Sequence, residues 1–170
     1  MPDAVALVQS LSATAWLMTA GLALAIVASA FLLLGSPRYK RQDTLFSKAE
    51  LAFFRALERA VGEEYRIFAK VRLADVLTPV GRTQSRRWWR AFTKVSSKHL
   101  DYVLVDPQTS QIRLAVELDD RSHEKKRRKA RDAFVNRVCA QAGVPLLRVS
   151  VAGRYDREAL RARLAQAQVC

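Results

Sequence analysis

Apolar residues in the stretch that follows residue 43 recur at helical spacing. They stand at every fourth position: Leu45, Ala49, Phe53 and Leu57. This spacing places them on one face of an α-helix. Ser47 and Glu50 have the S-x-x-E spacing of a capping box, and Gly62 is typical of a helix end. The pattern therefore predicts a helix over 43–62 that buries one face.

Alternating or continuous apolar runs further along the chain predict four strands. The runs cover 65–71, 100–105, 112–118 and 144–151. The second and third form a hairpin, because Asp106 and Pro107 begin a turn between them. Helical spacing predicts a helix from Ser122 to Gly143 and a last helix that begins at Asp156. The order α-β-β-β-α-β-α indicates an α/β fold in one domain over 45–170.

The residues before this domain follow a different pattern. No charged residue occurs over 4–37, and the apolar run over 13–35 exceeds the roughly 20 residues that a membrane-spanning helix needs. Arg38, Lys40 and Arg41 follow in a basic linker over 38–44. The positive-inside rule then predicts a single-pass protein of the inner membrane with its C-terminal domain in the cytoplasm. A cleaved signal peptide is the alternative, since residues 28–30 read Ala-Ser-Ala.

The chain is strongly basic, and its positive charges are unevenly distributed. The net charge is +13 and the pI is near 10.5, and all 29 lysines and arginines lie at or after Arg38. Such a basic domain favours an anionic partner, either nucleic acid or an anionic membrane surface. Cys139 and Cys170 lack the spacing of a zinc site and are interpreted as reduced, which agrees with a cytosolic setting.

Acidic residues interrupt the apolar hairpin at one end. Glu117 and Asp119 are two residues apart at the end of the later strand of the hairpin and so lie on the same face of it. Asp101, on the earlier strand of the hairpin, can join them. Three carboxylates at one place would repel and raise one another's pKa unless a divalent cation neutralised them; oxygen ligands suit Mg²⁺ or Mn²⁺. His123, at the following turn, is placed to orient or deprotonate a water molecule. The alternatives are a capping role for Glu50, solvated strand ends for the acids and a surface histidine.

Several stretches carry a resemblance to a known family. They read "HLDYVLVD", "IRLAVELDDRSH" and "RDAFVNRVCAQAGVPLLRV". Over about 45–151 the chain resembles the bacterial family known as domain of unknown function 2726. At greater distance it resembles very-short-patch-repair-type endonucleases of the PD-(D/E)XK superfamily. The resemblance implies a mixed sheet in a restriction-endonuclease-like αβββαβ core.

The resemblance also implies metal-dependent hydrolysis of phosphodiesters. In that scheme Asp101 and Glu117 are metal ligands, and Glu50 is an extra acid from the first helix. Asp119 stands where the superfamily usually has a lysine and cannot act as its ammonium. Either His123 or a base from the following helix replaces that lysine, or the site has lost activity. The related repair endonucleases use a histidine here, which favours the first alternative.

Two basic stretches are candidates for binding nucleic acid. The first occupies the start of the predicted helix after the hairpin: Lys125, Lys126, Arg127, Arg128 and Arg131. Cations there oppose the helix dipole, so a bound anion such as a phosphate would compensate them. The second is "RRWWRAF", with Arg86, Arg87, Trp88 and Trp89, which could stack on bases. The alternatives are a solvated helix face for the first and an amphipathic helix on the sheet or the bilayer for the second.

These observations favour a membrane-anchored nuclease-like domain that uses Mg²⁺ or Mn²⁺ and acts on nucleic acid, with DNA favoured over RNA. The main alternative is a catalytically inactive module of the same fold that binds nucleic acid or a partner at the membrane. Purely electrostatic association with a membrane surface is a third interpretation.

Overall fold

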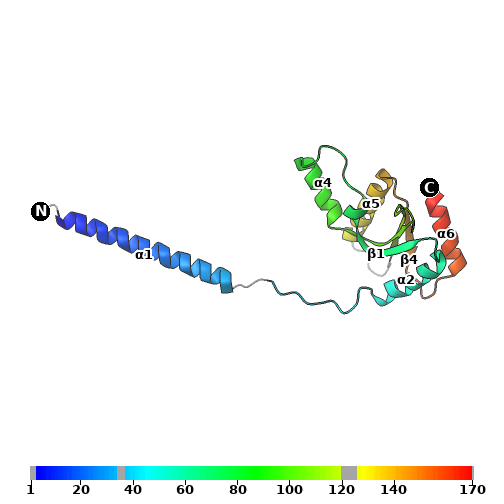
Figure 1. Ribbon diagram of the computed structural model, residues 1–170, viewed down its shortest axis with the longest axis horizontal. Coiled ribbons are helices and arrows are strands. Elements are labelled where there is room, and N and C mark those ends of the chain that lie inside the picture. The colour runs from blue at the N-terminus through cyan, green and yellow to red at the C-terminus, as the bar shows by residue number, and fades with distance from the viewer. Residues whose placement is uncertain (1–2, 34–36, 120–125, 170) are drawn as a thin grey trace. The chain divides into compact units, whose positions relative to one another are not determined.

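The computed structural model describes residues 3–33, 37–119 and 126–169, with side chains for 15–31, 37–119 and 129–168. The chain divides into two compact units, Met1–Asp43 and Thr44–Cys170. The first contains helix α1, Asp3–Leu33 (Figure 1). Among the residues that the structure describes, no helix is long and apolar enough to cross a membrane. The transmembrane helix predicted over 13–35 extends beyond the side chains described for α1, and it stays a prediction.

A four-stranded mixed sheet forms the centre of the second unit. Its strands follow the order β1-β2-β3-β4. Their bounds are Arg66–Arg72, His99–Val105, Ile112–Asp119 and Leu146–Ser150. Strands β1, β2 and β3 pair antiparallel, whereas β4 pairs parallel to β3. The predicted α/β class and the predicted hairpin are therefore confirmed.

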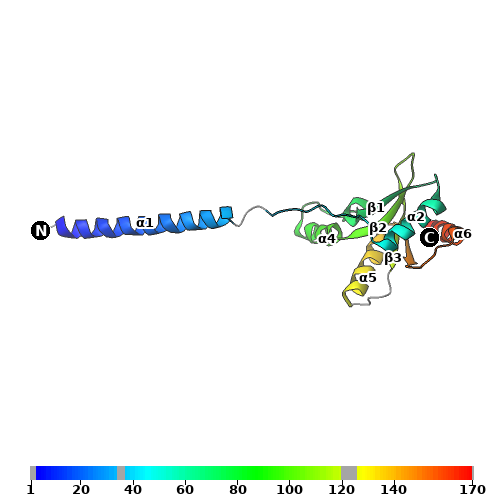
Figure 2. The same ribbon diagram turned by 90° about the horizontal axis from the view of Figure 1, so that it is seen from below.

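Helices cover both faces of the sheet (Figure 1, Figure 2). On one face, α2 (Lys48–Val61) and α6 (Arg157–Val169) pack on a buried cluster that includes Phe53 and Tyr102. On the other, α3 (Leu73–Val76), α4 (Arg86–Ser96) and α5 (Lys126–Gln141) pack on a cluster that includes Val95 and Val103. Burying apolar side chains on both faces stabilises this three-layer arrangement.

Helix α3 was not foreseen, whereas α4 is the amphipathic helix on the sheet that the sequence analysis gave as the alternative for "RRWWRAF". Helices α3 and α4 lie between β1 and β2, in a stretch without a clear apolar pattern. Ser85 caps α4, since its side chain accepts a hydrogen bond from the Trp88 backbone N–H at 3.1 Å. Val95 then anchors the other end of α4 in the core. A cap at its start and a buried side chain near its end thus hold α4 on the sheet.

Candidate functional site

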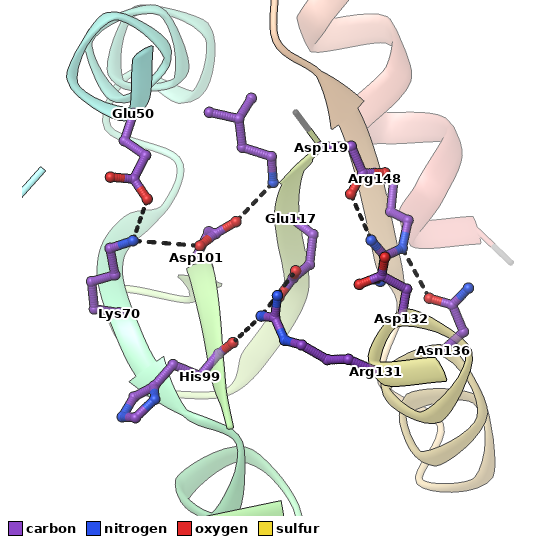
Figure 3. Close-up of polar contacts among 11 residues, drawn as sticks. Glu50, Lys70, His99, Asp101, Glu117, Asp119, Arg131, Asp132, Asn136 and Arg148 are labelled. Carbon is purple, nitrogen blue, oxygen red and sulfur yellow. Dashed lines mark hydrogen bonds and ion pairs between the residues drawn. The ribbon is translucent and has the colours of Figure 1, made fainter. Parts of the chain in front are cut away.

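A cleft of about 970 Å³ opens at the end of the sheet where β1, β3 and β4 finish and β2 begins. Residues from six elements line it, and Figure 3 shows the polar contacts among many of them. The charged residues that line the cleft are Glu50, Lys70, Lys98, Asp101, Glu117, Asp119, Lys129, Arg131 and Asp132. The cleft therefore brings together the three acids predicted for the hairpin, the acid of the first helix and several cations.

Glu50 serves the helix cap and the cleft with different oxygens. One carboxylate oxygen accepts a hydrogen bond from the Ser47 backbone N–H at 2.8 Å, and Ser47 Oγ accepts one from the Glu50 N–H at 3.3 Å. The predicted capping box is thus present. The other oxygen accepts a hydrogen bond from Lys70 Nζ. Burial alone would raise the pKa of Glu50, but the contacts with Lys70 and Ser47 lower it on balance.

Lys70 is a residue of the site that the sequence analysis missed. It lies on β1, and its neighbours Ala69 and Val71 pair with Tyr102 and Leu100, so Lys70 stands across from Asp101. Its ammonium contacts Glu50 and lies 3.6 Å from Asp101 Oδ1. A single charged residue in the apolar stretch "IFAKV" was the available signal.

The Asp101 side chain makes a hydrogen bond to β3 beyond the point where the backbone pairing of β2 with β3 ends. The register between β2 and β3 runs as far as Tyr102 and Val116. Beyond that pair, Asp101 Oδ2 accepts a hydrogen bond from the Leu118 backbone N–H at 3.0 Å. The side chain thus occupies the place of a backbone carbonyl, and it fixes the end of β3 that carries Glu117 and Asp119.

Glu117 is the buried acid of the cleft, with only 2 % of its surface exposed. Burial, together with the charge of Asp101, raises its pKa to about 7 against the opposing effect of nearby arginines. Oε2 lies 3.7 Å from Arg131 Nη2. Oε1 is buried and has no hydrogen-bond partner among the described residues. A buried carboxylate oxygen without a protein partner is costly, and Oε1 is available to accept a hydrogen bond or to bind a cation.

Asp119 is directed to a different partner. Its Oδ1 lies 2.7 Å from Arg148 Nη1 on β4, and Arg148 also contacts Asp132 at 3.5 Å and Asn136 at 3.0 Å (Figure 3). Within the described part of the chain, no three Asp, Glu, His or Cys side chains are grouped so as to hold a metal ion. The structure therefore places Asp101 and Glu117 near each other and pairs Asp119 with an arginine. The role of Asp119 as a ligand stays a prediction.

The basic stretch at the start of α5 is described only in part. His123 and Lys125 lie outside the described residues. Lys126, Arg127 and Arg128 begin α5, and their side chains also lie outside the described residues. Arg131 contacts Glu117 and donates a hydrogen bond to the His99 backbone oxygen at 3.2 Å. Of this stretch, Arg131 is therefore the one predicted residue whose side chain is seen in the cleft.

The second basic stretch lies on α4. Trp88 stacks on Phe92 with ring centroids 5.0 Å apart, and its Nε1 donates a hydrogen bond to the Pro79 backbone oxygen at 3.0 Å. Arg86, Arg87 and Trp89 are exposed. Trp88 is thus engaged within the fold, while its three neighbours remain accessible to a partner.

The chain belongs to the family described as "Protein of unknown function (DUF2726)", whose model matches residues 42–168. This match runs from before α2 to residue 168 in α6 and includes all of the residues that line the cleft. No curated protein and no solved structure matches the chain.

Proposed function

We propose that the Thr44–Cys170 unit is a metal-dependent nuclease that hydrolyses phosphodiester bonds of nucleic acid, with DNA as the preferred substrate. The observation that carries the proposal is the buried Glu117, with its unpartnered Oε1, beside Asp101 in a cleft bordered by cations. Apart from α3 and α4, which lie between β1 and β2, the element order α2-β1-β2-β3-α5-β4 agrees with the αβββαβ core of the restriction-endonuclease-like fold. That agreement supports the further proposal that this unit has a restriction-endonuclease-like fold.

The acids suit a hard divalent cation. Mg²⁺ and Mn²⁺ prefer oxygen ligands, and the repulsion between two nearby carboxylates is relieved by such a charge. Asp101 and Glu117 would hold the ion, and Oε1 of Glu117 would gain the partner that it lacks. A bound metal ion supplies a more acidic water molecule and offsets phosphate charge.

The protein's own residues would bind and orient the nucleic acid. Lys98, Lys129 and Arg131 line the cleft, and lysine and arginine side chains are the usual contacts of phosphate oxygens. In the hydrolysis, a water oxygen forms a bond to phosphorus as the bond from phosphorus to the leaving oxygen breaks. The attacking water loses a proton to solvent and the leaving oxygen gains one. The products are a hydroxyl group and a phosphomonoester.

One observation favours a second candidate, an inactive module that binds nucleic acid. Each acid of the cleft already has a cationic partner: Lys70 contacts Glu50 and Asp101, Arg131 lies beside Glu117, and Arg148 pairs with Asp119. An acid cluster neutralised in this way needs no metal to fold. Such a module would bind nucleic acid with equal affinity in the presence and absence of the metal.

The test is cleavage by the purified full-length chain in detergent. Plasmid DNA, single-stranded DNA and RNA are incubated with Mg²⁺, Mn²⁺ or EDTA. We expect cleavage with a metal and none in EDTA, and we expect Glu117→Gln to reduce the rate by a factor of about 10³ or more, the scale on which single catalytic groups act. Glu63→Gln, at an exposed position outside the cleft, is the matched control and retains activity.

The two candidates give different results in this experiment. Binding of DNA without cleavage of any substrate, unaffected by EDTA, would support the inactive module. Cleavage at an equal rate by wild type and Glu117→Gln would show that a contaminating nuclease or a different site is responsible.

We also propose that the residues over 13–35 anchor the chain in the inner membrane with the second unit in the cytoplasm. The sequence carries this proposal, since the uncharged stretch over 4–37 is followed directly by Arg38, Lys40 and Arg41. Association of the basic domain with anionic lipid would add to the anchor but would be lost in high salt.

Extraction of membranes with alkaline carbonate tests the anchor. We expect the wild-type chain to stay in the pellet. The double variant Leu24→Lys/Ile26→Lys moves to the supernatant, because a lysine at the centre of a membrane helix costs about 2.5–3.5 kcal/mol. Leu45→Lys, which changes an exposed leucine of the second unit, is the control and stays in the pellet. Release of the wild-type chain by carbonate would contradict an integral anchor and would leave electrostatic association.

A further inference from the structure

Lys70 has an unusual backbone conformation for its position. Its φ is 54°, in the left-handed region that glycine favours and a lysine adopts at a cost. The other non-glycine residues described with positive φ, Gln84 and Ser110, lie in turns or loops, whereas Lys70 lies inside a strand. Backbone strain of this kind persists where the surrounding structure requires it, and it is concentrated at functional sites.

This conformation changes which face of the sheet the neighbouring residues cover. Before Lys70, Ile67 and Ala69 pack against the core beneath α2 and α6. After it, Val71 packs against the core on the opposite face, although regular alternation would return it to the first. The partner strand switches at the same point, since Tyr102 and Leu100 belong to different cores. Lys70 and Asp101 therefore lie across from each other at the point where β1 and β2 both change the faces that their side chains cover. Both residues line the cleft.

The Lys70 ammonium is held there by two acids. Glu50 accepts a hydrogen bond from it, and Asp101 Oδ1 lies 3.6 Å away, while about a third of the lysine side chain remains exposed. Burial alone would lower the pKa of Lys70, but Glu50 and Asp101 outweigh it and raise the pKa. The two carboxylates around the group favour its charged form, the ammonium. It can donate hydrogen bonds and positive charge, but it is not a base.

We infer that Lys70 is a catalytic residue of the proposed hydrolysis, whose ammonium, held in the cleft by Glu50 and Asp101, binds a non-bridging oxygen of the phosphate under attack. This inference rests on the proposed nuclease function. Lys70 neither gives nor takes a proton; it stabilises the negative charge of the transition state.

The contacts distinguish Lys70 from the other cations near the acids. Arg148 is occupied by Asp119, Asp132 and Asn136. Arg131 has Glu117, a proposed metal ligand, as its acidic partner. Lys70, unlike Arg148, lines the cleft, and Glu50 can stay bound to it when Asp101 takes a metal ion. Glu50 is therefore a positioning residue, which gives its second carboxylate oxygen a function beyond the helix cap.

The experiment compares Lys70→Gly with Ser110→Gly in the full-length chain. Both variants place glycine at a left-handed position, so the backbone is suited to each, and only the first removes the ammonium. Ser110 lies in the turn between β2 and β3 and does not line the cleft. We expect kcat to fall by a factor of about 10²–10³ in Lys70→Gly, as for loss of one oxyanion donor, and to stay at the wild-type value in Ser110→Gly.

Two further readouts separate catalysis from structure. Calorimetric titration of Mn²⁺ is expected to give at least wild-type affinity for Lys70→Gly, since a competing cation has left Asp101. Addition of n-butylammonium chloride is expected to restore part of the rate in Lys70→Gly and none in Glu117→Gln, because the amine can replace only the missing ammonium.

The outcomes are distinguishable from failure of the proposed function. An active wild type with equal kcat in Lys70→Gly and Ser110→Gly overturns the role of Lys70 and leaves the nuclease standing. Loss of Mn²⁺ binding in Lys70→Gly shows a structural role and also overturns the inference. A wild type that cleaves no substrate with any metal overturns the nuclease, and the catalytic role of Lys70 falls with it.

Discussion

Glu117→Gln is expected to raise the free energy of unfolding of the metal-free protein by about 3–3.5 kcal/mol at pH 8, at about 1.4 kcal/mol for each unit by which a pKa is displaced. Burial and the neighbouring Asp101 raise the pKa of Glu117 from its ordinary value of 4.5 to about 7. At pH 8 Glu117 is ionised in both the folded and the unfolded state. Its charge is less stable in the buried site of the folded protein than in the solvated unfolded chain, so it lowers the free energy of unfolding. Glutamine has a similar shape and carries no charge.

The pH dependence gives this prediction its sign. Between pH 4.5 and about 7, folded Glu117 binds more protons than unfolded Glu117 does, so its contribution to stability is fully present below pH 4.5 and is lost as the pH rises through about 7. The stability difference between Glu117→Gln and wild type is consequently small at pH 4 and largest above pH 7. The same substitution that stabilises the protein is the one expected to remove cleavage.

Urea unfolding in EDTA, followed by tryptophan fluorescence at pH 4, 6 and 8, measures the difference. Glu63→Gln, at an exposed position, is expected to match wild type throughout. Addition of Mn²⁺ is expected to stabilise wild type and not Glu117→Gln, by linkage of binding to folding. A Glu117→Gln protein that is less stable than wild type at pH 8 in EDTA would mean that the contact with Arg131 outweighs the cost of burial.

Phe53→Ala is expected to reduce the free energy of unfolding by about 3–5 kcal/mol, the usual cost of a large cavity in a core. Phe53 is fully buried between α2 and the sheet, where its ring lies 5.4 Å from that of Tyr102 and 5.1 Å from that of Tyr155. The loss of packing is also expected to affect the cleft, because Glu50 lies in the first turn of the same helix. The Glu50 backbone oxygen accepts a hydrogen bond from the Tyr102 hydroxyl at 2.8 Å.

Phe68→Ala is the matched control for this second prediction. Phe68 lies on β1 with 53 % of its surface exposed, so its removal leaves no cavity and is expected to cost under about 1 kcal/mol. Both variants are compared with wild type by urea unfolding under identical conditions. Equal losses for the two substitutions would contradict the placement of Phe53 in the core.

The periodicity of apolar residues was sufficient to predict the hairpin, the first helix and the final strand and helix. The capping box could also be predicted, since Ser47 and Glu50 lie within one helical turn. Local spacing likewise placed Glu117 and Asp101 at the same end of two paired strands. These predictions succeed because the relevant contacts are short-range or follow from the alternation of a strand.

The missed features depend on information that spacing does not carry. The position of Lys70 in the cleft depends on a left-handed backbone inside β1, which the alternation of residues along a strand does not predict. The partner of Asp119 follows from the parallel pairing of β3 with β4, which places Glu117 beside Arg148 and Asp119 beside Ser150. Sequence order alone could not give that register, because a helix separates the two strands.

The contact between Asp119 and Arg148 also has a consequence for the history of the family. The two side chains are partly buried, and loss of one partner would leave the other charge without compensation. We therefore expect the two positions to covary among family members, so that a lineage with an uncharged residue at 119 has also replaced the arginine at 148. A lysine at 119 would require the same exchange, because two cations side by side would repel each other.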